Sequence, residues 1–205
     1  MDNLSFPTKG NLILAKNSLA LARQGYELMD KKRNILIREL MSLVEQAKDI
    51  QTEIRTTFQT AYGALQRASM ELGNNFVADI ARNVPVEDTI EVKLRSIMGT
   101  EIPLVRHDPA TRTPAYAFYS TTESLDIARV SFEKVKDLTV KLSMVETSAY
   151  LLAANIKKAQ KRANALQNIT IPRYEALVKD IANALEEKER EEFTRLKVIK
   201  KMHTG

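Results

Sequence analysis

The chain has 205 residues, of which 44% are hydrophobic, 28% are charged and only 6% are aromatic. Six Gly and six Pro are too few for a low-complexity or collagen-like chain, and the apolar fraction is too high for a disordered one. Because there is no cysteine, the sequence excludes a disulfide framework, a zinc–thiolate site and a thiol nucleophile. The 31 Lys and Arg residues are interleaved with 26 Asp and Glu residues, which is typical of a solvated helical surface and argues against a nucleic-acid interface.

The sequence also argues against direct insertion into a membrane. No apolar run approaches the roughly 20 residues of a membrane-spanning helix. The first 16 residues lack the apolar core of a signal peptide. We therefore expect a soluble, cytosolic chain.

Apolar residues in the first part of the chain recur at alternating steps of three and four, from Leu12 to Ala61. The polar exceptions in this pattern are Arg33 and Thr57. A 3.5-residue repeat keeps one seam of a helix against a partner helix, so the pattern predicts a coiled coil. We expect one helix from near Thr8 to about Leu72, within an N-terminal coiled-coil segment of residues 1–72.

The same spacing returns in the last segment, residues 121–205. It is unbroken from Leu142 to Leu166 and less regular on either side. Pro172 lies inside this pattern, and a proline in a helix removes one backbone hydrogen bond and kinks the helix. We expect a second coiled-coil helix from about Thr121 to Lys200, bent near residues 168–172.

Residues 73–120 differ in composition from both helical segments and form an insert between them. A stretch that alternates apolar and polar residues, with β-branched side chains, predicts a strand, and a Met-Gly-Thr sequence after it supplies a turn. The expected elements are helical turns at Phe76–Ala81, strands at Thr89–Ser96 and Glu101–Arg106 with Pro103 marking an edge, and a loop over residues 108–114. A lone β-hairpin is marginally stable, so this one should lean on the helix ends or on a partner.

Two long helices joined by a short insert should fold back on each other as a rod. The predicted fold class is all-α: a long antiparallel two-helix coiled coil with a small β-hairpin insert at the end opposite the termini. If residues 72 and 121 are level, the numbers of paired residues add up to roughly 193. Arg33 then lies opposite small alanines and should snorkel its charge outward, so replacing it with leucine should be neutral or stabilising. Gly25 should lie near residues 168–172, and the second helix should outrun the first by roughly ten residues.

The search for chemistry finds no catalytic or metal-binding constellation. His107 and His203 fall in the predicted loop and at the terminus, and there is no His-Glu-x-x-His, Gly-x-Ser-x-Gly or phosphate-loop motif. The carboxylates of residues 186–192 alternate with basic residues at helical spacing, as on a solvated helix face. Basic clusters such as residues 157–162 leave a phosphate or anionic-lipid site open, but their composition favours a solvated face. We expect no enzyme activity, no cofactor, no metal and no nucleic-acid partner.

Short motifs along nearly the whole chain resemble the D subunit of the V-type/A-type rotary ATPases. Each motif is weak alone, but they occur together and in the same order. They are Pro7–Lys9, Leu19–Gly25, Leu28–Met29, Lys32–Arg33, Ser96–Gly99 followed by Pro103, Arg162–Leu166, Ile169–Arg173, Glu189–Phe193 and Arg195–Lys197.

The resemblance implies a central-stalk rotor subunit without a nucleotide site of its own. In that family the two termini of the coil enter a hexamer of alternating catalytic A and B subunits. The other end binds the F subunit of the stalk and the membrane-side cap above the ion-carrying ring. The implied place is therefore the cytoplasmic side of a membrane, as a peripheral part of a bound complex.

Two groups of residues are the candidate partner contacts. One is the predicted C-terminal overhang, where an apolar row (Phe193, Leu196, Ile199) is accompanied by basic residues (Arg190, Arg195, Lys197, Lys200). A free helix would not keep such a row in water without cover, so we expect it to sit in the bearing of the hexamer. The other is the predicted hairpin tip, Ile97, Met98 and Gly99, which we expect to make a docking or regulatory contact.

The sequence has three alternative interpretations, of which the length of the insert disfavours the first. The gamma subunit of the F-type enzyme is also an antiparallel coil, but it carries a sizeable α/β domain for which residues 73–120 are too short. The other two are a homodimeric coiled-coil scaffold and a membrane-bending helical module. Recovery of the chain with a multisubunit ATPase head would favour the rotor interpretation over both.

Overall fold

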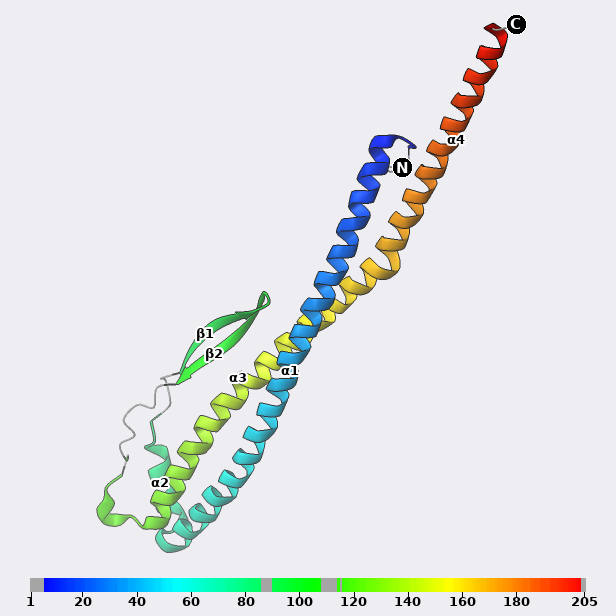
Figure 1. The fold of residues 1–205 in the computed structure, drawn as a ribbon. Coiled ribbons are helices and arrows are strands. Elements are labelled where there is room, and N and C mark those ends of the chain that lie inside the picture. Colours follow the sequence, from blue (N-terminus) through cyan, green and yellow to red (C-terminus); the bar gives the residue numbers. More distant parts are fainter. Residues whose placement is uncertain (1–5, 86–89, 108–113, 115, 204–205) are drawn as a thin grey trace. The chain divides into compact units, whose positions relative to one another are not determined.

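The structure is a computed structural model that describes residues 6–85, 90–107, 114 and 116–203. Helices dominate these residues, and one two-stranded sheet lies between them in the sequence (Figure 1). The elements are α1 (Lys9–Leu72), α2 (Asn74–Arg82), β1 (Ile90–Ile97), β2 (Thr100–His107), the 3-10 turn η2 (Phe118–Ser120), α3 (Glu123–Ala165), the π-helical turn η3 (Leu166–Thr170) and α4 (Ile171–His203). The predicted fold class, mostly helical with a small β-hairpin insert, is confirmed.

Contacts divide the chain into two compact units, which we describe separately. Unit 1 comprises Met1–Ile35 and Ile156–Gly205, and unit 2 comprises Leu36–Asn155. The sequence predicted a different division, into residues 1–72, 73–120 and 121–205, which follows the order of elements along the chain. That division stays a prediction. The placement of the hairpin opposite the termini also stays a prediction, because the termini belong to unit 1 and the hairpin belongs to unit 2.

Local backbone chemistry explains both ends of α1. Thr8 caps the N-terminus, where its Oγ1 accepts a hydrogen bond from the backbone N–H of Asn11 at 3.2 Å. This bond satisfies one of the donors that the first helical turn leaves open. At the other end, Gly73 has a φ of 88°, which side-chain-bearing residues rarely adopt. The helix therefore stops at Leu72, and α2 begins at Asn74.

In unit 2, α1 packs antiparallel against α3. The buried side chains on α1 are mostly alanine, and those on α3 are mostly larger, so small residues face large ones. They are Leu36, Ala61, Ala64 and Ala68 on α1, and Leu125, Ala128, Val135, Leu138, Val145 and Leu152 on α3. Polar contacts flank this core: Glu53–Lys134 at 2.8 Å, Gln51–Glu146 at 3.2 Å and Glu71–Ser124 at 3.2 Å. The reversed order of these partners along α3 shows the antiparallel direction.

The hairpin leans on the middle of α3, which corrects the expectation that it leans on the helix ends. The backbone N–H of Val105 in β2 donates a hydrogen bond to Sδ of Met144, the N···S distance being 3.3 Å. Val105 lies two residues before the end of β2, so the open end of the hairpin, and not its tip, contacts the middle of α3. The loop predicted over residues 108–114 lies, apart from Pro114, outside the described residues.

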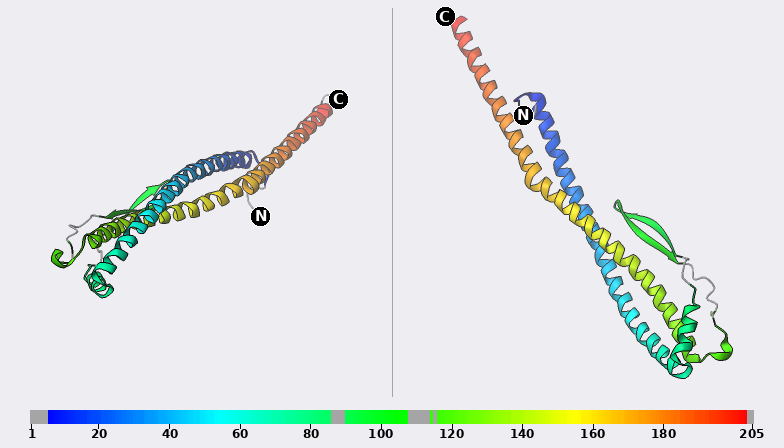
Figure 2. Two further views of the ribbon diagram at one scale, coloured as in Figure 1. Left: turned by 90° about the horizontal axis from the view of Figure 1, so that it is seen from below. Right: turned by 180° about the vertical axis from the view of Figure 1, so that it is seen from behind.

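In unit 1, the first half of α1 runs antiparallel to the end of α3 and to α4. Three side-chain contacts join them: Lys9–Glu189 at 3.0 Å, Arg23–Glu175 at 2.6 Å and Arg33–Gln160 at 2.7 Å. Apart from Ile181 on α4, the buried residues are alanines: Ala15 and Ala22 on α1, and Ala159 and Ala163 on α3. Both views in Figure 2 show α4 continuing past the start of α1.

The bend predicted near residues 168–172 corresponds to η3. The N–H of Ile171 bonds to the carbonyl of Leu166, five residues back, instead of four. In a regular helix the ring of Pro172 would clash with the carbonyl of Asn168, and the wider turn moves that carbonyl away. Gly25 faces this turn, since a Cβ at Gly25 would lie 3.6 Å from Cδ1 of Leu166.

Candidate partner-binding surfaces

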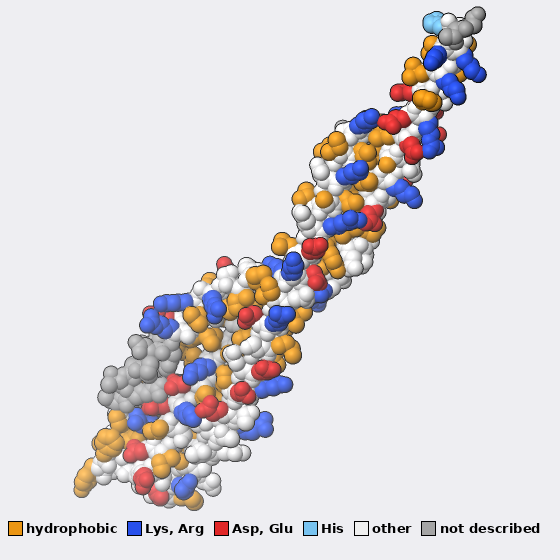
Figure 3. All heavy atoms as spheres, viewed as in Figure 1, with side chains coloured by type: hydrophobic (Ala, Val, Ile, Leu, Met, Phe, Trp, Pro, Cys, Tyr) orange, Lys and Arg blue, Asp and Glu red, His pale blue; other side chains and the backbone are white. Residues whose placement is uncertain are grey.

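The C-terminal overhang is present in unit 1. An ion pair with Glu189 joins Lys9, the first residue of α1, to α4, and α4 continues from there to His203. Apolar side chains on this segment are 48 to 76% exposed: Phe193, Leu196, Val198, Ile199 and Met202. Figure 3 shows hydrophobic side chains (orange) among basic ones (blue) toward the C-terminal end of α4. We call residues 190–203 the overhang.

The apolar residues of the overhang do not form one face, although the sequence suggested a row. Phe193, Leu196, Ile199 and Met202 follow one another at steps of three. At about 100° per residue, each step turns back by about 60°, so Phe193 and Met202 point in opposite directions. A helix that is apolar on several sides needs cover on several sides. This pattern suits a helix end that is surrounded and not one that is docked along a single stripe.

The basic residues of the overhang are partly neutralised within α4 itself. Arg190 contacts Glu186 at 2.5 Å, and Arg195 contacts Glu191 at 3.8 Å. All four side chains are at least 60% exposed, and such surface pairs contribute about 0–1 kcal/mol. Acidic groups of a partner could therefore replace Glu186 and Glu191 with little loss.

The hairpin tip has an unusual backbone. Met98 and Gly99 form a two-residue turn in which both residues have positive φ, 49° and 74°. This is the turn type whose twist matches a β-hairpin, and its first position prefers Asn, Asp or Gly. A methionine there costs about 1–2 kcal/mol in backbone energy. Met98 is also 46% exposed, so packing within the chain does not explain its presence. Strain of this kind is often kept at functional sites.

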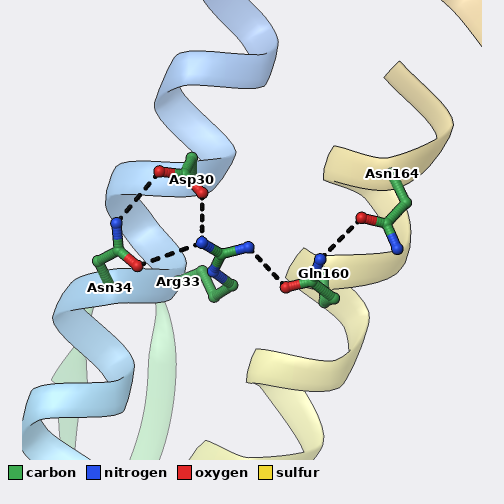
Figure 4. A network of polar contacts seen from close by, with 5 residues as sticks. All are labelled: Asp30, Arg33, Asn34, Gln160 and Asn164. Atoms are coloured by element: carbon green, nitrogen blue, oxygen red, sulfur yellow. Dashed lines mark hydrogen bonds and ion pairs between the residues drawn. The ribbon is translucent and has the colours of Figure 1, made fainter. Parts of the chain in front are cut away.

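A polar layer around Arg33 is a feature that sequence reasoning missed (Figure 4). Its guanidinium contacts Asp30 at 2.5 Å and donates hydrogen bonds to Oε1 of Gln160 at 2.7 Å and to Asn34 at 3.4 Å. Gln160 in turn donates to Asn164 at 2.7 Å. Arg33 therefore does not snorkel outward but reaches across to α3. The sequence did contain a signal for this layer. Asp30 and Arg33 are one helical turn apart, as are Gln160 and Asn164, and side chains at that spacing can contact each other.

A second polar cluster ties the end of the insert to the start of α3. The hydroxyl of Tyr116 donates a hydrogen bond to Oδ1 of Asp126. Burial, together with this bond, raises the pKa of Tyr116 from 10.0 to about 12, and the nearby Arg129 partly opposes the shift. The phenol therefore stays protonated and acts as a structural donor at neutral pH.

Among the described residues, the overhang and the hairpin tip are the candidate surfaces for partner contact. They hold no group of three or more His, Cys, Asp or Glu side chains placed to bind a metal ion. None of the described helices combines the length and the apolar character needed to cross a membrane. Exposed apolar side chains on the overhang and a strained turn at the hairpin tip are typical of a helical subunit of a larger assembly.

Comparisons with known proteins agree with this class. The family described as the D subunit of ATP synthase matches residues 11–201. The D subunit of the V-type ATP synthase of Thermotoga neapolitana is 41% identical over 194 residues, which covers 95% of this chain and 96% of the relative. The D subunits of the A-type ATP synthases of Thermococcus kodakarensis and Pyrococcus horikoshii are each 36% identical over 197 residues, covering 95% of this chain and 92% of each relative. The chain belongs to the family of ATP synthase D subunits, whose members are central-stalk subunits of V-type and A-type ATP synthases.

Proposed function

We propose that the chain is the non-catalytic rotor shaft that couples ATP hydrolysis or synthesis in a catalytic hexamer to ion translocation. In this proposal its partners are the A and B subunits of the hexamer, the F subunit of the stalk and the membrane-side cap above the ion-carrying ring. The complex would lie on the cytoplasmic side of the membrane, and the chain would be peripheral to it. The nucleotide sites would belong to the hexamer, and the chain would supply no active site.

One observation carries the proposal: the overhang exposes apolar side chains on several sides of a helix that has left its partner. A ring of subunits surrounding the helix would cover Phe193, Leu196, Ile199 and Met202 together, whereas a single docked helix would cover one side. Each of these side chains stands to gain about 1.5–3 kcal/mol if it is fully buried. The overhang has one aromatic residue and two arginines, each of which is paired with a glutamate of α4, so it offers few of the aromatic and Arg anchors that usually hold one orientation tightly.

Truncation after Glu192 tests the proposal. The shortened chain should still assemble with the F subunit but lose hexamer affinity or torque, and the remaining binding should tolerate salt better, since Arg195, Lys197 and Lys200 are gone. Unchanged hexamer binding, rotation and salt dependence would contradict the proposal and make the overhang a bystander.

A substitution series separates lost apolar contacts from lost length. The triple variant Phe193→Gln, Leu196→Gln and Ile199→Gln keeps the helix, because glutamine is a good helix former. It should reproduce most of the affinity loss. The control, Glu187→Gln with Lys188→Gln, changes exposed side chains of the same helix ahead of the overhang, keeps the net charge and should bind the hexamer as the parent does.

A further inference from the structure

The β-hairpin has one covered edge and one open edge. The N–H of Val105 on the outer side of β2 is bonded to Met144 and not to Val92, its directly opposite partner in the hairpin. In an antiparallel pair, such non-hydrogen-bonded partners both turn their backbone groups outward. Pro103, opposite Leu94, has no N–H to present on the β2 edge. The β2 edge is therefore closed by α3 and by a proline.

The outer edge of β1 makes no backbone hydrogen bond to another of the described elements. The alternation that turns Val105 outward also turns outward the backbone groups of every second residue of β1, namely Ile90, Val92, Leu94 and Ser96. None of them is proline, and every residue of β1 up to Ser96 is exposed. An open edge with free donors and acceptors is a template for pairing with another strand.

A hairpin that is covered only by its own chain turns its apolar side chains toward that chain. In β1 the apolar side chains lie instead on the exposed face. The buried residues of the hairpin, Thr100 and Ile102, are 2 and 8% exposed and share a face with Lys93 and Arg95. Three apolar residues lie on the other face: Ile90, Val92 and Leu94 are 42, 63 and 69% exposed. The apolar face of β1 thus points away from the part of unit 2 that buries Thr100 and Ile102.

We propose that β1 is an acceptor strand, onto which an extended segment of a partner subunit adds as a third strand. The segment would continue the hairpin's backbone hydrogen bonding and place its apolar side chains beside Val92 and Leu94. The opposite face of β1 carries Glu91, Lys93 and Arg95. The ion pair between Glu91 and Lys93 is weak, because its N···O distance is 4.0 Å and both side chains are exposed. Two cations against one anion favour acidic residues at the neighbouring positions of the added strand. The occupant is therefore a strand that alternates apolar and acidic residues.

This inference rests on the proposed membership in a rotary complex. Amide hydrogen exchange tests it by comparing the isolated full-length chain with the same chain assembled with its ATPase partners. A peptide covering β1 contains four outward amides. In the isolated chain these should exchange rapidly, and in the complex they should slow by about tenfold or more, as hydrogen-bonded strand amides do. Equal exchange in both states overturns the inference. Protection in the isolated chain that grows with its concentration also overturns it, because the occupant is then a second copy.

Two substitutions of one residue separate strand addition from simple apolar contact. Leu94→Pro removes an outward N–H that makes no bond within the hairpin, so peptides of β2 should keep their protection while the protection of β1 on assembly is lost. Leu94→Thr removes apolar surface but keeps the N–H and a good strand former, and it should retain that protection. If Leu94→Pro behaves like the parent, or if Leu94→Thr loses as much, strand addition is refuted. Co-purification of the variants with the ATPase reports separately on the proposed function.

Discussion

Replacing Arg33 with methionine should destabilise the protein, which reverses the expectation from the sequence alone. The arginine occupies a seam position in the heptad pattern, where an apolar side chain would ordinarily be better. In the structure, however, its guanidinium is held by Asp30 and Gln160 at 2.5 and 2.7 Å. Methionine retains a stem of similar length, so the variant removes the polar contacts and leaves most of the packing.

The magnitude follows from the exposure of the partners. Hydrogen bonds that involve a charged group contribute about 1.5–3 kcal/mol when buried. The side chains of Arg33 and Asp30 are 25 and 32% exposed, so solvent screens part of this contribution. We expect a net loss of about 1–2 kcal/mol in the free energy of unfolding, which for a chain of this size lowers Tm by about 2–8 °C.

Thermal unfolding followed by circular dichroism measures the effect, and Arg23→Met is the matched control. Arg23 lies on the same helix and also makes one contact across to the C-terminal helices, with Glu175 at 2.6 Å. Its side chain is 59% exposed and that of Glu175 is 48% exposed, so the control should lose about 0–1 kcal/mol. If Arg33→Met loses no more than Arg23→Met, the polar layer does not stabilise unit 1 and the reasoning fails.

Three further changes test other parts of the structure. Leu152→Ala, at a fully buried position, should cost about 2–5 kcal/mol in urea unfolding, and a loss below about 1 kcal/mol would show that the site collapses without a cavity. Met98→Asn should relieve strain at the hairpin tip, slowing amide exchange in β1 and β2 while weakening any partner contact of the methionine side chain; unchanged exchange would mean the turn is not strained. Because the pKa of Tyr116 is raised to about 12 in the folded state, its contribution to stability is complete below pH 10 and lost as pH rises through 12. The stability difference between the parent and Tyr116→Phe should therefore shrink between pH 10 and 12, and a constant difference would rule out this linkage.

The helices and their register were predictable because a single physical rule, the burial of an apolar seam, operates along the whole chain. The predicted register, in which partner numbers add up to roughly 193, agrees within a few residues with Arg33–Gln160, Gln51–Glu146 and Glu71–Ser124. The two strands were also predicted, since alternation and a Met-Gly turn are local signals.

Contacts that depend on side-chain geometry were not predictable. The heptad pattern does not show whether Arg33 turns outward or across, because both choices leave the same spacing of apolar residues. The same holds for the hairpin, whose seat on Met144 depends on the direction in which the insert leaves α2. Pro172 indicated a break in the last helix, but the sequence does not show which carbonyls ahead of the proline shift to make room for its ring. In the structure they shift over the π-helical turn Leu166–Thr170.

The polar layer and the small residues of unit 1 together explain how two weakly packed helices can keep one register. Alanines such as Ala15, Ala22 and Ala159 make a seam that could slide by a heptad with little change in packing, because every level looks alike. Arg33 removes this freedom, since any shift would separate its guanidinium from Gln160 and leave a charge facing alanine. Losing the bond to Gln160 costs about 1–2 kcal/mol at this partly exposed site, because Asp30 on the same helix stays paired with Arg33. In the proposed rotor shaft, Arg33 would therefore supply both the stability that Arg33→Met is expected to lose and a fixed register, which an apolar residue at position 33 would not define.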